Sequence, residues 1–170
     1  RFAALGSLVF FTADDGVHGE ELWVSDGTEA GTQLVVDLLP GAGSSLPSNM
    51  TPFQGRIFFT ANDGVTGDEM WSTDGTAAGT TQVADIWTGA ESGLPNQRPQ
   101  NDHTYYVLDE VLYFGANDGS TGLELWRLDA DDADADGIPD YLESAAGCSG
   151  MDLDSDDDGF TDGEEDPNAN

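Results

Sequence analysis

The stretch Val9-Phe-Phe-Thr-Ala-Asp-Asp-Gly-Val-His-Gly-Glu-Glu-Leu-Trp23 occurs in three closely similar copies along the chain. The second copy is Ile57-Phe-Phe-Thr-Ala-Asn-Asp-Gly-Val-Thr-Gly-Asp-Glu-Met-Trp71, and the third is Leu112-Tyr-Phe-Gly-Ala-Asn-Asp-Gly-Ser-Thr-Gly-Leu-Glu-Leu-Trp126. The tryptophans that end the copies are 48 and 55 residues apart. A period of this length is typical of repeat architectures, so the repeat organises the fold.

Each copy predicts consecutive antiparallel strands. In the first copy, residues 8–13 and 20–25 are apolar runs of strand length, and residues 14–19 between them form a turn with two glycines. Residues 33–39 predict a third strand, and the weaker segment 49–54 predicts a fourth. Four short strands in about 45 residues match one blade of a β-propeller.

The predicted fold class is therefore all-β, with β-propeller-blade-like antiparallel repeats. The copies define a body of residues 1–128, with units of about 4–52, 53–105 and 106–128. They amount to about 2.75 four-stranded units, because the third copy loses its last strand, and a closed propeller needs about four blades. We expect the body to be open, or to be completed by upstream blades or by other chains, since bare strand edges invite pairing.

Two copies continue into a second motif, Ser25-Asp-Gly-Thr-Glu-Ala-Gly-Thr32 and Thr73-Asp-Gly-Thr-Ala-Ala-Gly-Thr80. Together with the preceding Glu-Leu-Trp, this sequence resembles the bacterial ELWxxDGTxxGT repeat family over residues 5–128. The resemblance implies propeller-type blades within large secreted or surface proteins. It implies no reaction.

Two residue types recur at the end of every copy. We predict that the tryptophans pack between strands or blades, and the alternative is that they stack on sugars. We predict that the glutamates two positions earlier accept hydrogen bonds at turns or strand ends, and a calcium role together with an aspartate of each turn is the alternative. The residues concerned are Trp23, Trp71 and Trp126, Glu21, Glu69 and Glu124, and Asp15, Asp63 and Asp118.

The charge of the chain excludes several classes of function. Asp and Glu number 34, whereas Lys and Arg number 4, so the net charge is -30. Such a chain does not neutralise phosphates, which argues against binding to nucleic acid or to an anionic membrane surface. No purely apolar run exceeds four residues, so no segment is predicted to insert into a membrane.

The charge is concentrated in residues 129–170, which hold 16 acidic residues and no basic one. Within them, residues 132–143 and 154–165 both match the calcium-loop pattern D-x-[DN]-x-[DN]-G-x5-E at every position. This spacing supplies the six or more oxygen ligands that Ca²⁺ prefers. The predicted ligands are carboxylates of Asp132, Asp134, Asp136, Asp140 and Glu143 and of Asp154, Asp156, Asp158, Asp162 and Glu165, with the backbone carbonyls of Ile138 and Phe160.

The helices of an EF-hand are not expected around these loops, because Pro139 lies inside the first loop and Pro167 follows the second. Residues 130–170 instead resemble thrombospondin type 3 and related bacterial repeats. The resemblance implies a helix-poor chain wound around a row of calcium ions. We therefore predict a calcium-wrapped stalk after the repeat body.

Catalysis is not predicted. His18 and His103 are the two histidines, and neither falls in a nucleophile–base arrangement that repetition or spacing would indicate. Ser25 and Asp26 are adjacent, which differs from the spacing of a sialidase-type Asp box. A propeller glycosidase that uses a pair of acids is the enzymatic alternative.

The sequence predicts a secreted or cell-surface, non-enzymatic, calcium-binding structural or adhesion module of a large extracellular protein. The alternative is a subunit of an extracellular, calcium-stabilised filament that polymerises through strand addition or through stalk contacts. The expected partners are other copies of the chain, neighbouring domains of a longer chain, and a carbohydrate or cell-surface ligand.

Overall fold

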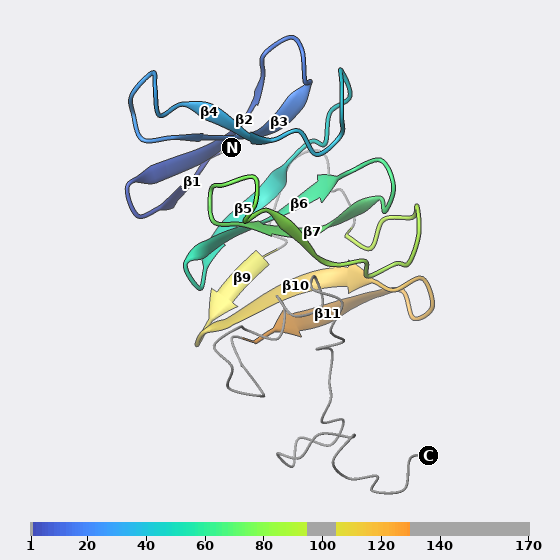
Figure 1. Cartoon of the computed structure of the whole chain (residues 1–170). Helices are drawn as coiled ribbons and strands as arrows, with labels where there is room; N and C mark the ends of the chain where they lie inside the picture. Colours follow the sequence, from blue (N-terminus) through green and yellow to red (C-terminus); the bar gives the residue numbers. More distant parts are fainter. Residues whose placement is uncertain (1, 95–104, 130–170) are drawn as a thin grey trace, which may run out of the picture. The chain divides into compact units, whose positions relative to one another are not determined.

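The computed structural model describes residues 2–94 and 105–129. Arg1–Asp129 form one compact unit, and within the described ranges every regular element is a strand (Figure 1). The all-β prediction is therefore confirmed for this part of the chain. A helix long and apolar enough to cross a membrane is not found in these ranges.

The described residues form three antiparallel sheets, each of which follows the previous one along the chain. Sheet 1 has the order β1 (Phe2–Leu5), β2 (Leu8–Asp14), β3 (Glu20–Ser25) and β4 (Gln33–Val36). Sheet 2 has the order β5 (Ser48–Phe53), β6 (Arg56–Asn62), β7 (Asp68–Thr73) and β8 (Thr81–Ala84). Sheet 3 consists of β9 (Tyr105–Leu108), β10 (Val111–Asn117) and β11 (Leu123–Leu128), with β10 in the middle.

The segment predicted as the fourth strand of the first unit instead begins the second sheet. It forms β5 (Ser48–Phe53), which pairs with β6. The physical reason is the tight turn after Phe53, where Gln54 and Gly55 both have positive φ and fold β5 directly back onto β6. The first position of sheet 1 is filled by β1, which the sequence analysis did not predict. The predicted unit boundaries at 52/53 and 105/106 therefore cut through the first strand of a sheet.

The first two sheets pack face to face around a common core. Paired residues of neighbouring strands lie on the same face, so Phe10 and Val24 share one face of sheet 1, whereas Phe59 and Trp71 share one face of sheet 2. All four residues belong to one buried cluster. We call the face that a sheet turns to the next sheet its forward face, and the opposite one its backward face.

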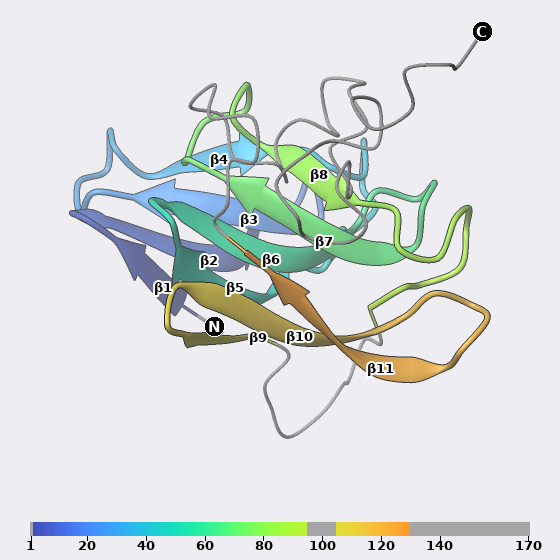
Figure 2. The same cartoon turned by 90° about the horizontal axis from the view of Figure 1, so that it is seen from below.

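The third sheet packs on the forward face of sheet 2 in the same order. On that face, Phe58 and Thr60 are at most 1% exposed, and the hydroxyl groups of Thr60 and Tyr105 are joined by a hydrogen bond of 3.0 Å. The Tyr105 ring in turn lies edge-on to Phe114 of β10, with ring centroids 6.1 Å apart. Sheets 1, 2 and 3 are therefore stacked in chain order, as Figures 1 and 2 show from two directions.

Candidate functional site

The predicted calcium ligands all lie outside the described residues. They are Asp132, Asp134, Asp136, Ile138, Asp140, Glu143, Asp154, Asp156, Asp158, Phe160, Asp162 and Glu165. The calcium-wrapped stalk therefore stays a prediction. Across residues 2–94 and 105–129, no group of three or more His, Cys, Asp or Glu side chains is placed to hold a metal ion.

The repeated glutamate of the first unit is buried and anchors a loop. Glu21 is 0% exposed, and its carboxylate accepts the backbone N–H groups of Ser45 at 2.9 Å and of Leu38 at 3.3 Å. The Ser45 hydroxyl also donates to this carboxylate. We call residues 37–47 the first connector, because they lead from sheet 1 to sheet 2. Glu21 thus holds both ends of the first connector.

The second unit repeats this arrangement. Glu69 is 0% exposed, and its carboxylate accepts the backbone N–H groups of Gly93 at 2.6 Å and of Ile86 at 3.1 Å. Residues 85–94 are the corresponding second connector. The predicted hydrogen-bond-acceptor role is confirmed for Glu21 and Glu69.

The third glutamate behaves differently. Glu124 is exposed and accepts no hydrogen bond within the described part of the chain. Its own sheet ends at β11, and the structure describes no connector that follows this strand. The glutamate is therefore buried only where a connector folds over it.

The connectors also join each sheet to the next one through backbone hydrogen bonds. The Ser45 carbonyl accepts the N–H of Asn62, the last residue of β6, at 2.9 Å, and the Gly93 carbonyl accepts the N–H of Asn117, the last residue of β10, at 2.8 Å. One peptide segment thus donates to the glutamate of its own sheet and accepts from the following sheet. The glutamate, the connector and the next sheet form one continuous hydrogen-bonded unit.

Burial controls the protonation of these glutamates. Removal from water raises the pKa of Glu69 to about 7, against the opposing effect of N–H donors from Gly93, Ile86 and Trp87. Burial also raises the pKa of Glu21, opposed first by the Ser45 hydroxyl and backbone N–H. Both carboxyl groups accept hydrogen bonds from the connectors.

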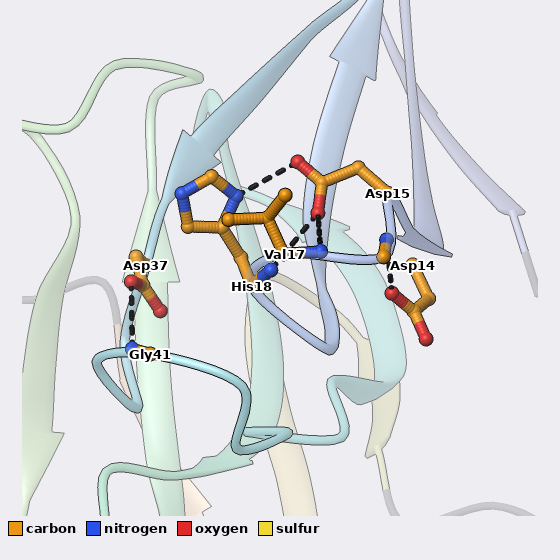
Figure 3. A network of polar contacts seen from close by, with 7 residues as sticks. Asp14, Asp15, Val17, His18, Asp37 and Gly41 are labelled. Atoms are coloured by element: carbon orange, nitrogen blue, oxygen red, sulfur yellow. Dashed lines mark hydrogen bonds and ion pairs between the residues drawn. The ribbon is translucent and has the colours of Figure 1, made fainter.

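The repeated aspartates of the turns are occupied by local hydrogen bonds. As Figure 3 shows, one carboxylate oxygen of Asp15 accepts the N–H groups of Val17 and His18, both at 2.9 Å, and the other lies 2.7 Å from His18 Nδ1. The N–H donated by His18 is the main reason why the pKa of Asp15 falls to about 2. Contact with the Asp15 carboxylate raises the pKa of His18. These interactions stabilise a turn.

The Asp-Gly-Thr motif is also a self-contained turn. The Asp26 carboxylate accepts both the N–H and the hydroxyl of Thr28, at 2.9 and 2.7 Å. The Thr28 hydroxyl in turn accepts the N–H of Gly31, at 2.9 Å. Asp74, Thr76 and Gly79 repeat these contacts in the second unit. The motif therefore closes the connection from the third to the fourth strand of each complete sheet.

The repeated tryptophans occupy equivalent positions on the backward faces. Trp71 is 9% exposed and belongs to the core between sheets 1 and 2. Trp126 packs on Phe114, with ring centroids 6.5 Å apart. The predicted packing role therefore holds for these two residues. Trp23 lies across from Phe11 on the backward face of sheet 1, which no other described sheet covers.

Sequence reasoning missed the connector residues. Ser44 and Ser92 accept the backbone N–H groups of Glu20 and Asp68, at 2.9 and 3.0 Å. The available signal was a short second repeat, Ser-Ser-Leu-Pro at 44–47 and Ser-Gly-Leu-Pro at 92–95. It has the same 48-residue spacing as the first two tryptophans.

Comparisons of the chain with protein-family models, with curated proteins and with solved structures find no match.

Proposed function

We propose that this chain is a non-enzymatic, calcium-binding structural module of a secreted or cell-surface protein, built from propeller-type blades and a calcium-ordered stalk. The observation that carries the proposal is the repeated use of the motif residues for architecture. Glu21 and Glu69 anchor connectors, and Asp15 and Asp26 close turns. The most prominent polar residues of the repeat are thus engaged in holding the sheets and their connections.

The calcium part of the proposal rests on the sequence of residues 130–170. Two complete loop motifs bring carboxylates together that repel one another without metal, so binding of the ion and ordering of the loop are coupled. Extracellular calcium modules bind at about 10⁻⁴–10⁻³ M. An affinity in that range would suit a protein that works outside the cell.

The test is calcium titration of the full chain by isothermal calorimetry. We expect two sites, one of which is lost in Asp132→Asn/Asp134→Asn and the other in Asp154→Asn/Asp156→Asn. Asp26→Asn/Asp74→Asn is the matched control, because it removes the same charge from turns of the body and should leave both sites intact. A stoichiometry unaffected by the stalk variants, or no binding at millimolar calcium, would contradict the proposal.

A second candidate function is a subunit of an extracellular filament that grows by strand addition. The observation that favours it is that, within the described residues, β11 lies at an edge of sheet 3, whereas β4 and β8 cover the equivalent edges in sheets 1 and 2. An uncovered edge is a template for a strand from another chain. Light scattering on a sizing column, in calcium and in EGTA, tests this candidate: large species support it, and a monomer in both buffers contradicts it.

A further inference from the structure

The two ends of the stack of sheets are chemically complementary. Sheet 3 has a forward face and sheet 1 has a backward face that no other described sheet covers. Each face has equivalents in the other sheets, and those equivalents are buried. The exposed residues at the two ends can therefore be compared, position by position, with residues whose partners are known.

The forward face of sheet 3 exposes a position that is otherwise part of the core. Leu125 is 77% exposed, whereas its equivalents Leu22 and Met70 are 0% and 1% exposed. Leu123 lies on the same face and is 63% exposed. The other copies carry Glu20 and Asp68 at the position of Leu123, so the uncovered face is more apolar at this position. Arg127 lies on the same face, where the other sheets have Val24 and Ser72, and it pairs with Asp129 at 2.9 Å.

The backward face of sheet 1 likewise exposes a position that is buried in the other two sheets. Val9 is 40% exposed, whereas its equivalents Ile57 and Leu112 are 0% exposed. Phe2 pairs with Phe11 on the same face and is 78% exposed. Burying this face would remove a continuous group of apolar side chains from water, which is favourable in proportion to the area covered.

The turn glycines show where a preceding unit would lie. A Cβ added at Gly64 would lie 2.6 Å from Leu39, and one added at Gly119 would lie 2.5 Å from Trp87, so in both cases the preceding connector covers the turn. The equivalent Gly16 of sheet 1 has nothing within 4 Å of that position. The space that a preceding unit fills twice within the body is open at sheet 1.

We propose that a second copy of this chain stacks head to tail on the first, with Leu123 and Leu125 of one copy against Phe2 and Val9 of the other. This pairing of a forward with a backward face is the one that the body already makes twice, between sheets 1 and 2 and between sheets 2 and 3. The interface joins two different surfaces, so it forms a ring if the rotation closes and a filament if it does not. It needs neither calcium nor the edge of β11.

The net charge of -30 opposes this association. Salt screens repulsion between exposed charges and leaves apolar contacts in place. Association should therefore strengthen as sodium chloride is raised, and it should persist in EGTA. This salt dependence is opposite to that of an interface held by surface ion pairs.

The test is sedimentation velocity of the full chain over a concentration series in high salt and EGTA. The unmodified chain should self-associate, and Leu125→Glu and Phe2→Glu should each weaken association by about a hundredfold or more, because each would bury an unpaired carboxylate. Their mixture should form a one-to-one dimer. The Leu125→Glu copy keeps its backward face and the Phe2→Glu copy keeps its forward face, so one intact interface remains.

The control is Val65→Glu, which adds the same charge at a 69% exposed apolar residue of a turn in sheet 2 and should leave association unchanged. Near-ultraviolet circular dichroism verifies that each variant is folded. A chain that is monomeric throughout the series would overturn the proposal. So would association that survives both variants, as strand addition at β11 predicts, or association that survives in one variant by itself, as pairing of two like faces predicts. A mixture of the two variants that does not associate would also contradict the head-to-tail interface.

Discussion

The carboxylate of Glu21 accepts the backbone N–H of Ser45 at 2.9 Å, across 24 residues of chain. The second unit repeats this relationship between Glu69 and Gly93 with the same separation. In both cases the acceptor lies in the third strand of a sheet, and the donor lies in the connector that leads to the next sheet. The recurring glutamate of the motif thus fixes the path of the chain from sheet 1 to the first connector and from sheet 2 to the second connector.

Replacement of Glu69 by alanine should destabilise the body by about 2–4 kcal/mol, because it leaves buried N–H groups of the connector without an acceptor and removes a packed side chain. Glu124→Ala is the matched control, since the same motif position is exposed there, and its effect should stay within about 0.5 kcal/mol. Urea unfolding monitored by tryptophan fluorescence measures both. Equal effects of the two variants would contradict the anchoring role of Glu69.

The hairpins were the most predictable part of the fold. Apolar runs of strand length on either side of a glycine-containing turn predicted strands over residues 8–13 and 20–25, and these segments form β2 and β3. The acceptor role of Glu21 and Glu69 was also predictable, because a glutamate recurs two positions before the tryptophan of every copy, and a carboxylate that packing removes from water needs hydrogen-bond donors.

The short repeat at residues 44–47 and 92–95 marks the position of the connectors in the sequence, but it does not predict their structure, which depends on contacts distant in sequence. Ser45 is buried where it forms hydrogen bonds with Glu21 and Asn62. The residues next to Ser45 in the sequence do not predict either contact. For the same reason, Glu124 has the sequence of a buried anchor and is exposed. The pairing of β5 with β6 in sheet 2 depends on a two-residue turn at Gln54 and Gly55, which lies outside the three similar copies of the motif.

Stability should fall as the pH rises from about 4.5 to about 7, because burial raises the pKa of Glu69 from 4.5 to about 7. In this window the folded chain holds a proton that the unfolded chain has released, so unfolding releases protons and is favoured by higher pH. The contribution of protonated Glu69 to the stability of the fold is fully present below pH 4.5, and it is lost as the pH rises through about 7. Urea unfolding across this range measures the slope.

Glu69→Gln is the control for this pH dependence, because the amide keeps the volume and one acceptor oxygen but does not titrate. The slope of stability between pH 4.5 and 7 should become shallower in this variant. The same substitution at Glu124 should leave the slope as it is. Identical slopes in the unmodified chain and in Glu69→Gln would show that another group is responsible.

His18 should titrate above its ordinary pKa of 6.5, because its ring contacts the Asp15 carboxylate at 2.7 Å. The contribution to stability is present below pH 6.5 and is lost as the pH rises through the elevated pKa of the folded state. Titration of the imidazole resonances by NMR measures this value. Asp15→Asn should lower the pKa of His18, and an unchanged value would contradict the pairing.

Alanine at Gly67 should be far more damaging than alanine at Gly122, although the two glycines are equivalent in the repeat. Both have positive φ, +79° and +93°, so both variants share a backbone cost of about 1–2 kcal/mol. A Cβ at Gly67 would also lie 2.2 Å from the carbonyl oxygen of Glu91 in the second connector, whereas a Cβ at Gly122 would meet nothing within 4 Å. That clash adds about 1–3 kcal/mol.

The difference between the two glycine variants isolates the contact between connector and turn, because the shared backbone cost cancels. Thermal unfolding followed by circular dichroism should give a markedly lower midpoint for Gly67→Ala than for Gly122→Ala. Gly19→Ala should behave like Gly67→Ala, since its Cβ would meet the Gly43 carbonyl oxygen of the first connector at 1.9 Å. Equal midpoints for Gly67→Ala and Gly122→Ala would mean that the second connector does not lie against Gly67 in solution.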